Sequence, residues 1–81
     1  MIEIIAEKVN VYESNYHIWV VSGASNPIKE LTVYNLQGVI IYKKSSINAI
    51  SHTIDKNLPV GAYIVKVILE KNIDIFKVIM R

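Results

Sequence analysis

The sequence predicts an all-β fold, an immunoglobulin-like antiparallel β-sandwich of about seven strands. Its apolar residues recur with a period of about two almost throughout, as in half-buried strands, and not with the period of about 3.6 that marks a helix. Most of them are isoleucine and valine, whose β-branched side chains favour pleated strands. Clusters of glycine, proline, asparagine and serine separate the apolar runs, which indicates short strands joined by turns.

Seven segments have this strand pattern. They lie at residues 7–12, 16–22, 30–34, 39–44, 51–54, 63–69 and 75–80. In the first strand Val9 and Val11 share one face, and in the second Ile18 and Val20 alternate with Trp19.

Turn residues delimit the third and fourth strands. Pro27 ends the loop before the third strand and favours an extended conformation at Asn26. After that strand, Asn35 and Gly38 stand at the first and fourth positions of a type I turn. Gly38 can adopt the positive φ of a bulge, which lets such a turn close a hairpin. A looser connection then precedes the short fifth strand.

The last third of the chain predicts a closing hairpin. A turn at residues 58–61, shaped by Gly61, leads into the strand 63–69, and a polar break at residues 70–72 precedes the return strand. The return strand ends one residue before the C-terminus, so we expect that terminus to be held in the sheet. The residues expected in the core are Leu31, Val33, Val65, Val67, Phe76 and Val78.

Size and composition are those of one small domain. A chain of 81 residues buries only about 60% of its unfolded surface, and a hydrophobic content of 52% compensates for this. The absence of cysteine excludes disulfides and cysteine-based metal sites. The net charge of +2 is too small and too dispersed for a nucleic-acid-binding surface. No apolar run approaches the roughly 20 residues of a membrane-spanning helix.

The start of the chain allows two interpretations. Residues 2–6 form either an additional edge strand or the stub of a linker. The first residues lack both the basic segment and the long apolar segment of a signal peptide. If the domain is exported, we therefore expect it to be a piece of a longer precursor.

The polar residues give little basis for catalysis. His17 and His52 are the only histidines, and both are expected to be surface imidazoles. Ser51 cannot serve His52 as a nucleophile, because neighbouring residues of a strand point to opposite faces. The acidic residues are dispersed and form no calcium-binding loop. We predict a protein that is not an enzyme and that needs no metal or cofactor.

Two groups of side chains fit either burial or recognition. The five tyrosines form a recognition surface, or they are half-buried strand residues with hydroxyls at the rim. Several strands are also apolar on both faces, and in 63–69 Ile64 and Ile68 flank Lys66 on the second face. Such a face binds a partner, or it is covered by loops, by another copy of the chain or by a neighbouring domain.

Three segments together resemble a known family. They are a strand with a polar-x-x-Gly turn and return strand, a Leu-x-x-Gly-x-Tyr strand, and a terminal lysine with aliphatic residues, at residues 31–41, 58–67 and 77–81. Their order and spacing are similar to those of the C-terminal sorting domain, type A, of the type IX secretion system, found on cargo proteins of Bacteroidota. The resemblance covers roughly residues 9–81. The chain departs from the family pattern at Asn35 and Val39, where aspartate and arginine are common.

The resemblance implies a non-enzymatic export signal. Residues 1–81 would be a single sorting domain, covalently linked to a larger cargo on its N-terminal side. The outer-membrane translocon and its shuttle would recognise the domain, and a sortase would remove it, so that the cargo passes through the periplasm to the cell surface or the medium. Gly38 and Gly61 would shape the turns. The residues expected to carry recognition are Lys77, Val78, Ile79, Met80 and Arg81.

The expected partners are thus proteins, with no nucleic acid and no membrane-spanning segment, and self-association stays open. A second interpretation depends on the fold alone. Immunoglobulin- and fibronectin-like sandwiches also serve as structural or adhesion modules of cell-surface proteins. The sequence upstream separates the two: a large enzyme or adhesin after a signal peptide indicates sorting, whereas tandem sandwiches indicate a stalk.

Overall fold

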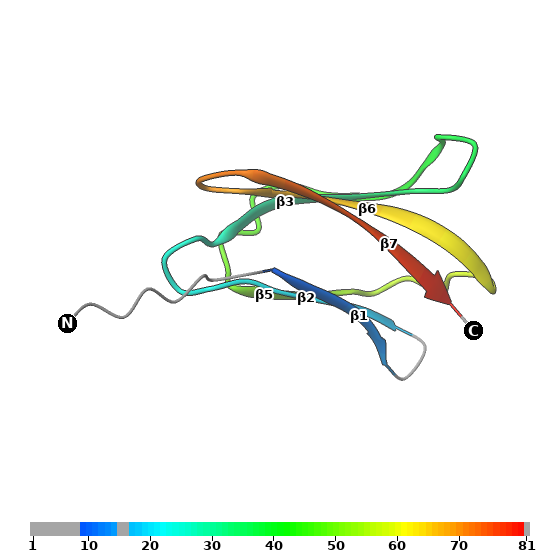
Figure 1. Ribbon diagram of the computed structural model, residues 1–81, viewed down its shortest axis with the longest axis horizontal. Helices are drawn as coiled ribbons and strands as arrows, with labels where there is room; N and C mark the ends of the chain where they lie inside the picture. Colours follow the sequence, from blue (N-terminus) through cyan, green and yellow to red (C-terminus); the bar gives the residue numbers. More distant parts are fainter. Residues whose placement is uncertain (1–8, 15–16, 81) are drawn as a thin grey trace.

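The computed structural model describes residues 9–14 and 17–80, and seven antiparallel strands occupy most of them (Figure 1). This confirms the predicted all-β class. The extra strand or linker considered for residues 2–6, and Arg81, lie outside the described residues. The strands are β1 (Asn10–Ser14), β2 (His17–Val21), β3 (Ile28–Tyr34), β4 (Ile40–Lys44), β5 (Ser51–Ile54), β6 (Gly61–Leu69) and β7 (Ile73–Met80).

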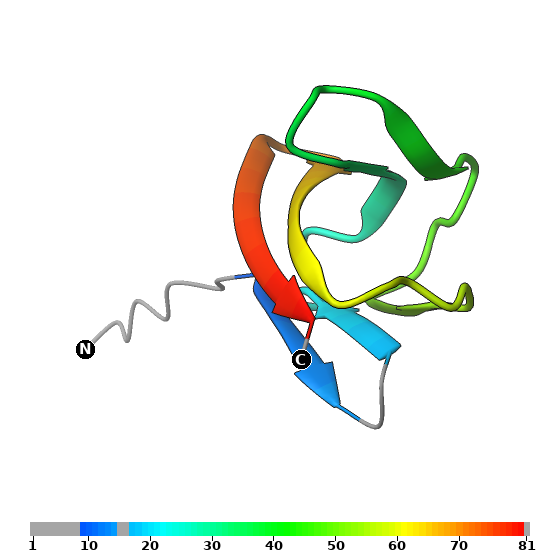
Figure 2. The same ribbon diagram turned by 90° about the vertical axis from the view of Figure 1, so that its right-hand side faces the viewer.

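Two sheets pack face to face as a sandwich (Figure 1 and Figure 2). The smaller sheet has the order β1-β2-β5 and the larger one the order β4-β3-β6-β7. The order is immunoglobulin-like with one change: in a constant-type domain the fourth strand lies beside the fifth, whereas here β4 pairs with β3. Both strands of the closing hairpin, β6 and β7, belong to the larger sheet. Its edge strand β7 passes beside β1 of the smaller sheet.

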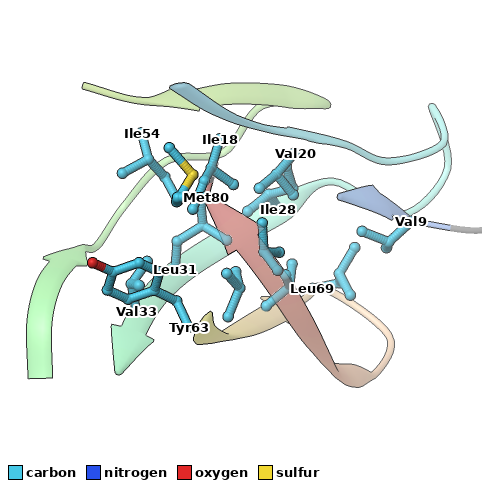
Figure 3. Close-up of a cluster of buried hydrophobic side chains, with 13 residues drawn as sticks. Val9, Ile18, Val20, Ile28, Leu31, Val33, Ile54, Tyr63, Leu69 and Met80 are labelled. Atoms are coloured by element: carbon cyan, nitrogen blue, oxygen red, sulfur yellow. The ribbon is translucent and has the colours of Figure 1, made fainter. Parts of the chain in front are cut away.

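The core lies between the two sheets (Figure 3). Ile18 and Ile54 point from the smaller sheet toward the inward side chains of the larger one. Five of the six predicted core residues are buried, and the sixth, Phe76, is half buried against them. The completely or almost completely buried side chains are Ile18, Val20, Ile28, Leu31, Val33, Ile54, Val65 and Val67.

Strand β3 begins two residues earlier than the periodicity predicts. Ile28 is completely buried, and its backbone N–H donates to the Ala49 carbonyl at 2.8 Å. This bridge extends β3 back to the residue after Pro27, because it gives the N–H of Ile28 a partner in the connection before β5. Sequence periodicity does not reveal such a partner, since it lies far along the chain.

The hairpin between β3 and β4 has the predicted turn. The Gly38 N–H donates to the Asn35 carbonyl at 3.0 Å, and Gly38 has a φ of +85°. The Asn35 side-chain oxygen also accepts hydrogen bonds from the backbone N–H groups of Gln37 and Val39. Asparagine thus stabilises the turn with its side chain as well as its backbone, and glycine supplies the left-handed conformation.

The connection into β6 forms a tyrosine corner. The Tyr63 hydroxyl donates to the Pro59 carbonyl at 2.6 Å, four residues upstream, while the aromatic ring is buried in the core. A tyrosine near the start of the sixth strand with this backbone contact is a recurrent feature of immunoglobulin-like sandwiches. The structure thus explains the Leu-x-x-Gly-x-Tyr pattern of the sequence. Its tyrosine holds in place the loop that connects β5 of the smaller sheet to β6 of the larger sheet.

Tyr63→Phe should lower the free energy of unfolding by about 1–2 kcal/mol, because the Pro59 carbonyl loses its hydrogen-bond donor. Urea denaturation followed by circular dichroism measures the change. Tyr34→Phe is the matched control, since the Tyr34 hydroxyl makes no hydrogen bond to the described residues. Equal losses in the two variants would show that the Tyr63 hydroxyl does not stabilise the corner.

Polar contacts join two loops at one end of the sandwich. Asn26, in the loop before β3, donates its side-chain N–H to the Asn72 side-chain oxygen at 2.7 Å and accepts from the Lys71 backbone at 2.9 Å. The Glu70 N–H also donates to the Pro27 carbonyl at 3.0 Å. The tip of the β6–β7 hairpin is thereby fixed to the body of the domain.

Candidate interaction surface

The candidate site is the outer face of the four-stranded sheet, the side turned away from the core. The inward residues of β6 and β7 alternate with outward ones, so each strand presents a row of side chains to solvent. Cross-strand pairing extends these rows over β3 and β4. The outer face consists of Glu30, Thr32, Tyr34, Ile40, Lys43, Ala62, Ile64, Lys66, Ile68, Ile73, Ile75, Lys77 and Ile79.

Isoleucines dominate the part of the outer face that lies on β7. The relative exposure is 56% for Ile73, 65% for Ile75 and 50% for Ile79. Opposite Ile73 and Ile79, strand β6 presents Ile68 and Ala62. Apolar side chains therefore make up most of the exposed surface over the closing hairpin, which confirms that this sheet is largely apolar on both faces.

Two lysines interrupt this apolar surface. Lys77 lies opposite Ile64, and Lys66 lies opposite Ile75, so the two lysines are diagonal neighbours on adjacent strands. Within residues 9–14 and 17–80, neither lysine takes part in an ion pair. The only carboxylate among the outer-face residues named above is Glu30, which is ion-paired with Lys43 at 3.7 Å. The surface over β6 and β7 is thus apolar and positively charged.

The structure divides the residues predicted to carry recognition into two groups. Lys77 and Ile79 point outward and are exposed. Val78 and Met80 point inward, with relative exposures of 6% and 3%, so they belong to the core (Figure 3 labels Met80). Arg81 lies outside the described part of the chain. Alternation along β7 explains the division, because successive side chains of a strand point to opposite sides.

Sequence reasoning did not single out Ile73 and Ile75 for recognition. Both lie on the same side of β7 as Ile79 and Lys77. The alternation of the strand could have identified them, because every second residue before Ile79 points to the same side, and these residues are Lys77, Ile75 and Ile73. Of the two glycines expected to shape turns, Gly38 lies in the β3–β4 turn, whereas Gly61 is already the first residue of β6 and has a φ of +152°.

The described residues contain no group of three or more histidine, cysteine, aspartate or glutamate side chains that could hold a metal ion. Ser51 and His52 lie on opposite faces of β5. His52 pairs with the buried Val20, whereas Ser51 pairs with Val21 on the outward side. The pair therefore has no geometry for nucleophilic catalysis.

His52 is not a surface imidazole, contrary to expectation. It is half buried at the open edge between the sheets, where its Nε2 and the Tyr42 hydroxyl of β4 are hydrogen-bonded at 2.9 Å. Burial lowers the pKa of His52, and the positive charge of Lys44 lowers it further. Burial also raises the pKa of Tyr42, with a smaller contribution from the negative charge of Asp55. Neutral His52 thus connects the two sheets.

The stability of the domain should fall as the pH drops below about 6.5, the pKa of histidine in an unfolded chain. Because the pKa of His52 is lowered by folding, the unfolded state binds the proton more tightly, and the loss continues until the pH passes the folded-state pKa. Urea denaturation at several pH values measures this slope. His52→Gln should reduce it, and an unchanged slope in that variant would contradict the assignment.

A comparison with protein families places the whole chain in one of them. A family model described as a domain of unknown function, DUF8694, matches residues 1–81. No protein with curated annotation matches the chain. No helix in the described residues is long and apolar enough to cross a membrane. The chain, an all-β sandwich with an exposed apolar and basic outer face, belongs to the DUF8694 domain family.

Proposed function

We propose that this domain is a non-enzymatic C-terminal sorting signal of the type IX secretion system, which directs a larger cargo through the outer-membrane translocon. The observation that carries the proposal is the closing hairpin. Strands β6 and β7 pair without interruption from Gly61 and Met80 to Ile68 and Ile73, and they expose isoleucines on one side. A rigid hairpin with an exposed apolar side is a surface that a receptor protein can bind with little loss of conformational entropy.

In this proposal the domain acts as an address and carries out no chemistry. The cargo is covalently attached upstream and travels with the domain through the periplasm. The translocon and its shuttle contact the outward residues of β7, with Lys77 and Ile79 from the predicted set and Ile75 beside them. A sortase then removes the domain, and the cargo is released or stays at the cell surface.

The test is made in a full-length cargo that ends in this domain. Deletion of residues 77–81 should leave the cargo in the periplasm, as measured by cell fractionation and surface labelling. Because the deletion also removes the core residues Val78 and Met80, the informative variants are Lys77→Ala, Arg81→Ala and Ile79→Ser.

Val60→Ser is the matched control for these variants, since Val60 is 79% exposed and lies on the loop before β6. The control should be exported normally. Circular dichroism of each purified domain checks that it is folded. Normal surface delivery of the cargo that lacks residues 77–81 would refute the sorting function.

A second candidate is a structural or adhesion module of a cell-surface protein. The strand order and the Tyr63–Pro59 corner favour it, because fibronectin- and immunoglobulin-like modules share this architecture. A fusion of the domain to the C-terminus of a periplasmic reporter enzyme separates the two. Delivery of the reporter to the cell surface supports sorting, and retention in the periplasm supports the structural module.

A further inference from the structure

Strand β7 lies at an edge of the larger sheet. Within residues 9–14 and 17–80 it pairs only with β6, while its neighbour across the sandwich, β1, belongs to the other sheet. Its register with β6 has no bulge, and it contains no proline. With eight residues it is longer than the other edge strands β1, β4 and β5. Such an edge offers a regular row of backbone groups to another extended segment.

The outward side chains of β7 follow a fixed order. From the C-terminal end they are Ile79, Lys77, Ile75 and Ile73, and all four are exposed. Side chains of a strand added at this edge would lie beside them on the same face. A well-matched neighbour is therefore apolar beside each isoleucine and acidic beside Lys77.

Charge decides between a second copy of the chain and a different partner. Lys66 and Lys77 make no ion pair with any residue between 9 and 80 that the structure describes, and Glu30 is already paired with Lys43. A second copy would bring two more lysines onto the same apolar face, where like charges repel. A segment with an acidic side chain beside Lys77 would neutralise that lysine, and its apolar side chains would cover the isoleucines at the same time.

We propose that β7 recruits an extended acidic segment of a partner protein as an additional antiparallel strand. The outward residues of that segment are apolar, acidic, apolar and apolar, opposite Ile79, Lys77, Ile75 and Ile73. The inference rests on the proposed function in one respect, since it takes the segment to belong to the receptor that reads the sorting signal. Backbone hydrogen bonds supply affinity, and the Lys77 contact fixes the register.

The probe is a short synthetic peptide that presents valine, glutamate, valine and valine at alternate positions, with threonine between them. A second peptide has lysine in place of the glutamate. The glutamate peptide should bind the 81-residue chain more tightly than the lysine peptide, as measured by NMR titration. Binding should also slow hydrogen exchange of β7 amides, because the edge becomes hydrogen-bonded.

Charge reversal gives the decisive comparison. Lys77→Glu should weaken binding of the glutamate peptide by about tenfold or more and should strengthen binding of the lysine peptide. Lys56→Glu is the matched control, because Lys56 is exposed on the loop after β5 and gives the same change in net charge. Equal effects of the two substitutions, no slowing of exchange in β7, or no binding of either peptide would overturn the proposal.

The same variants keep this inference separate from the sorting function. If Lys77→Glu abolishes export while neither peptide binds the unmodified domain, the edge-strand inference fails and the sorting signal stands. If the glutamate peptide binds as expected but the cargo that lacks residues 77–81 is exported normally, the edge is a binding site and the sorting function fails.

Discussion

Val65→Asp is expected to abolish the folded state. Val65 is completely buried between the two sheets, and its strand neighbours are Val33 on β3 and Phe76 on β7. These apolar neighbours offer a carboxylate neither a cation nor a hydrogen-bond donor, and an unpaired buried charge costs about 3–5 kcal/mol. The lost burial of the valine adds about 1.5–3 kcal/mol, and a single core in a domain of about 80 residues rarely supplies more than about 3–5 kcal/mol of stability. Far-UV circular dichroism and the dispersion of amide NMR signals should both show an unfolded chain.

Ile75→Asp is the control for this prediction. Ile75 lies on the opposite face of the same sheet and is 65% exposed, so its replacement buries no charge. This variant should remain folded, with a loss of at most about 1 kcal/mol from lower β-propensity. If both aspartate variants unfold the domain, the outer face is part of a larger core and is not a free surface.

Gly61→Val should destabilise the domain by about 3 kcal/mol, because Gly61 has a φ of +152°, in a region that side-chain-bearing residues rarely adopt. The residue pairs with Met80 at the start of β6. A Cβ added to Gly61 would meet no atom within 4 Å beyond its chain neighbours, so the cost comes from backbone strain and not from a steric clash. Urea denaturation measures the loss directly.

Ala62→Val adds the same side chain one residue later and serves as the control. Ala62 has ordinary strand geometry and faces Ile79 on the outer face. Valine is a better strand former than alanine, so this substitution should be neutral or slightly stabilising. Equal losses at positions 61 and 62 would show that β6 tolerates no added bulk, whatever its backbone conformation.

Alternation along the chain was sufficient to predict seven strands and five of the thirteen buried apolar residues among those that the structure describes. Val65 and Val67 are buried because every second residue of β6 faces the smaller sheet, and Leu31 and Val33 follow the same rule on β3. The turn at Asn35 and Gly38 was also predictable, because both residues act locally through their own conformations and hydrogen bonds. Local chemistry therefore accounts for the elements themselves.

Features that depend on distant parts of the chain were not predictable. Periodicity does not say which sheet β4 joins, and that choice brings Tyr42 next to His52 on β5. The half-buried position of Phe76 has a similar origin, because it lies on β7, which in the described part of the chain pairs with β6 alone. The candidate surface was predicted as an apolar second face, but the cross-strand neighbours of Ile73 and Ile75, which are Ile68 and Lys66 on β6, required the register of the closing hairpin.

The proximity of β1 to β7 has a consequence for the order of events during biosynthesis. The sandwich can close only when the segment Asn10–Ser14 meets the segment Ile73–Met80, which is made about 60 residues later. Contacts of such long sequence separation slow folding, so the nascent chain stays incompletely folded until β7 has been synthesised. An incompletely folded chain can still pass through a narrow channel, and it loses this ability once β7 has joined the sheet.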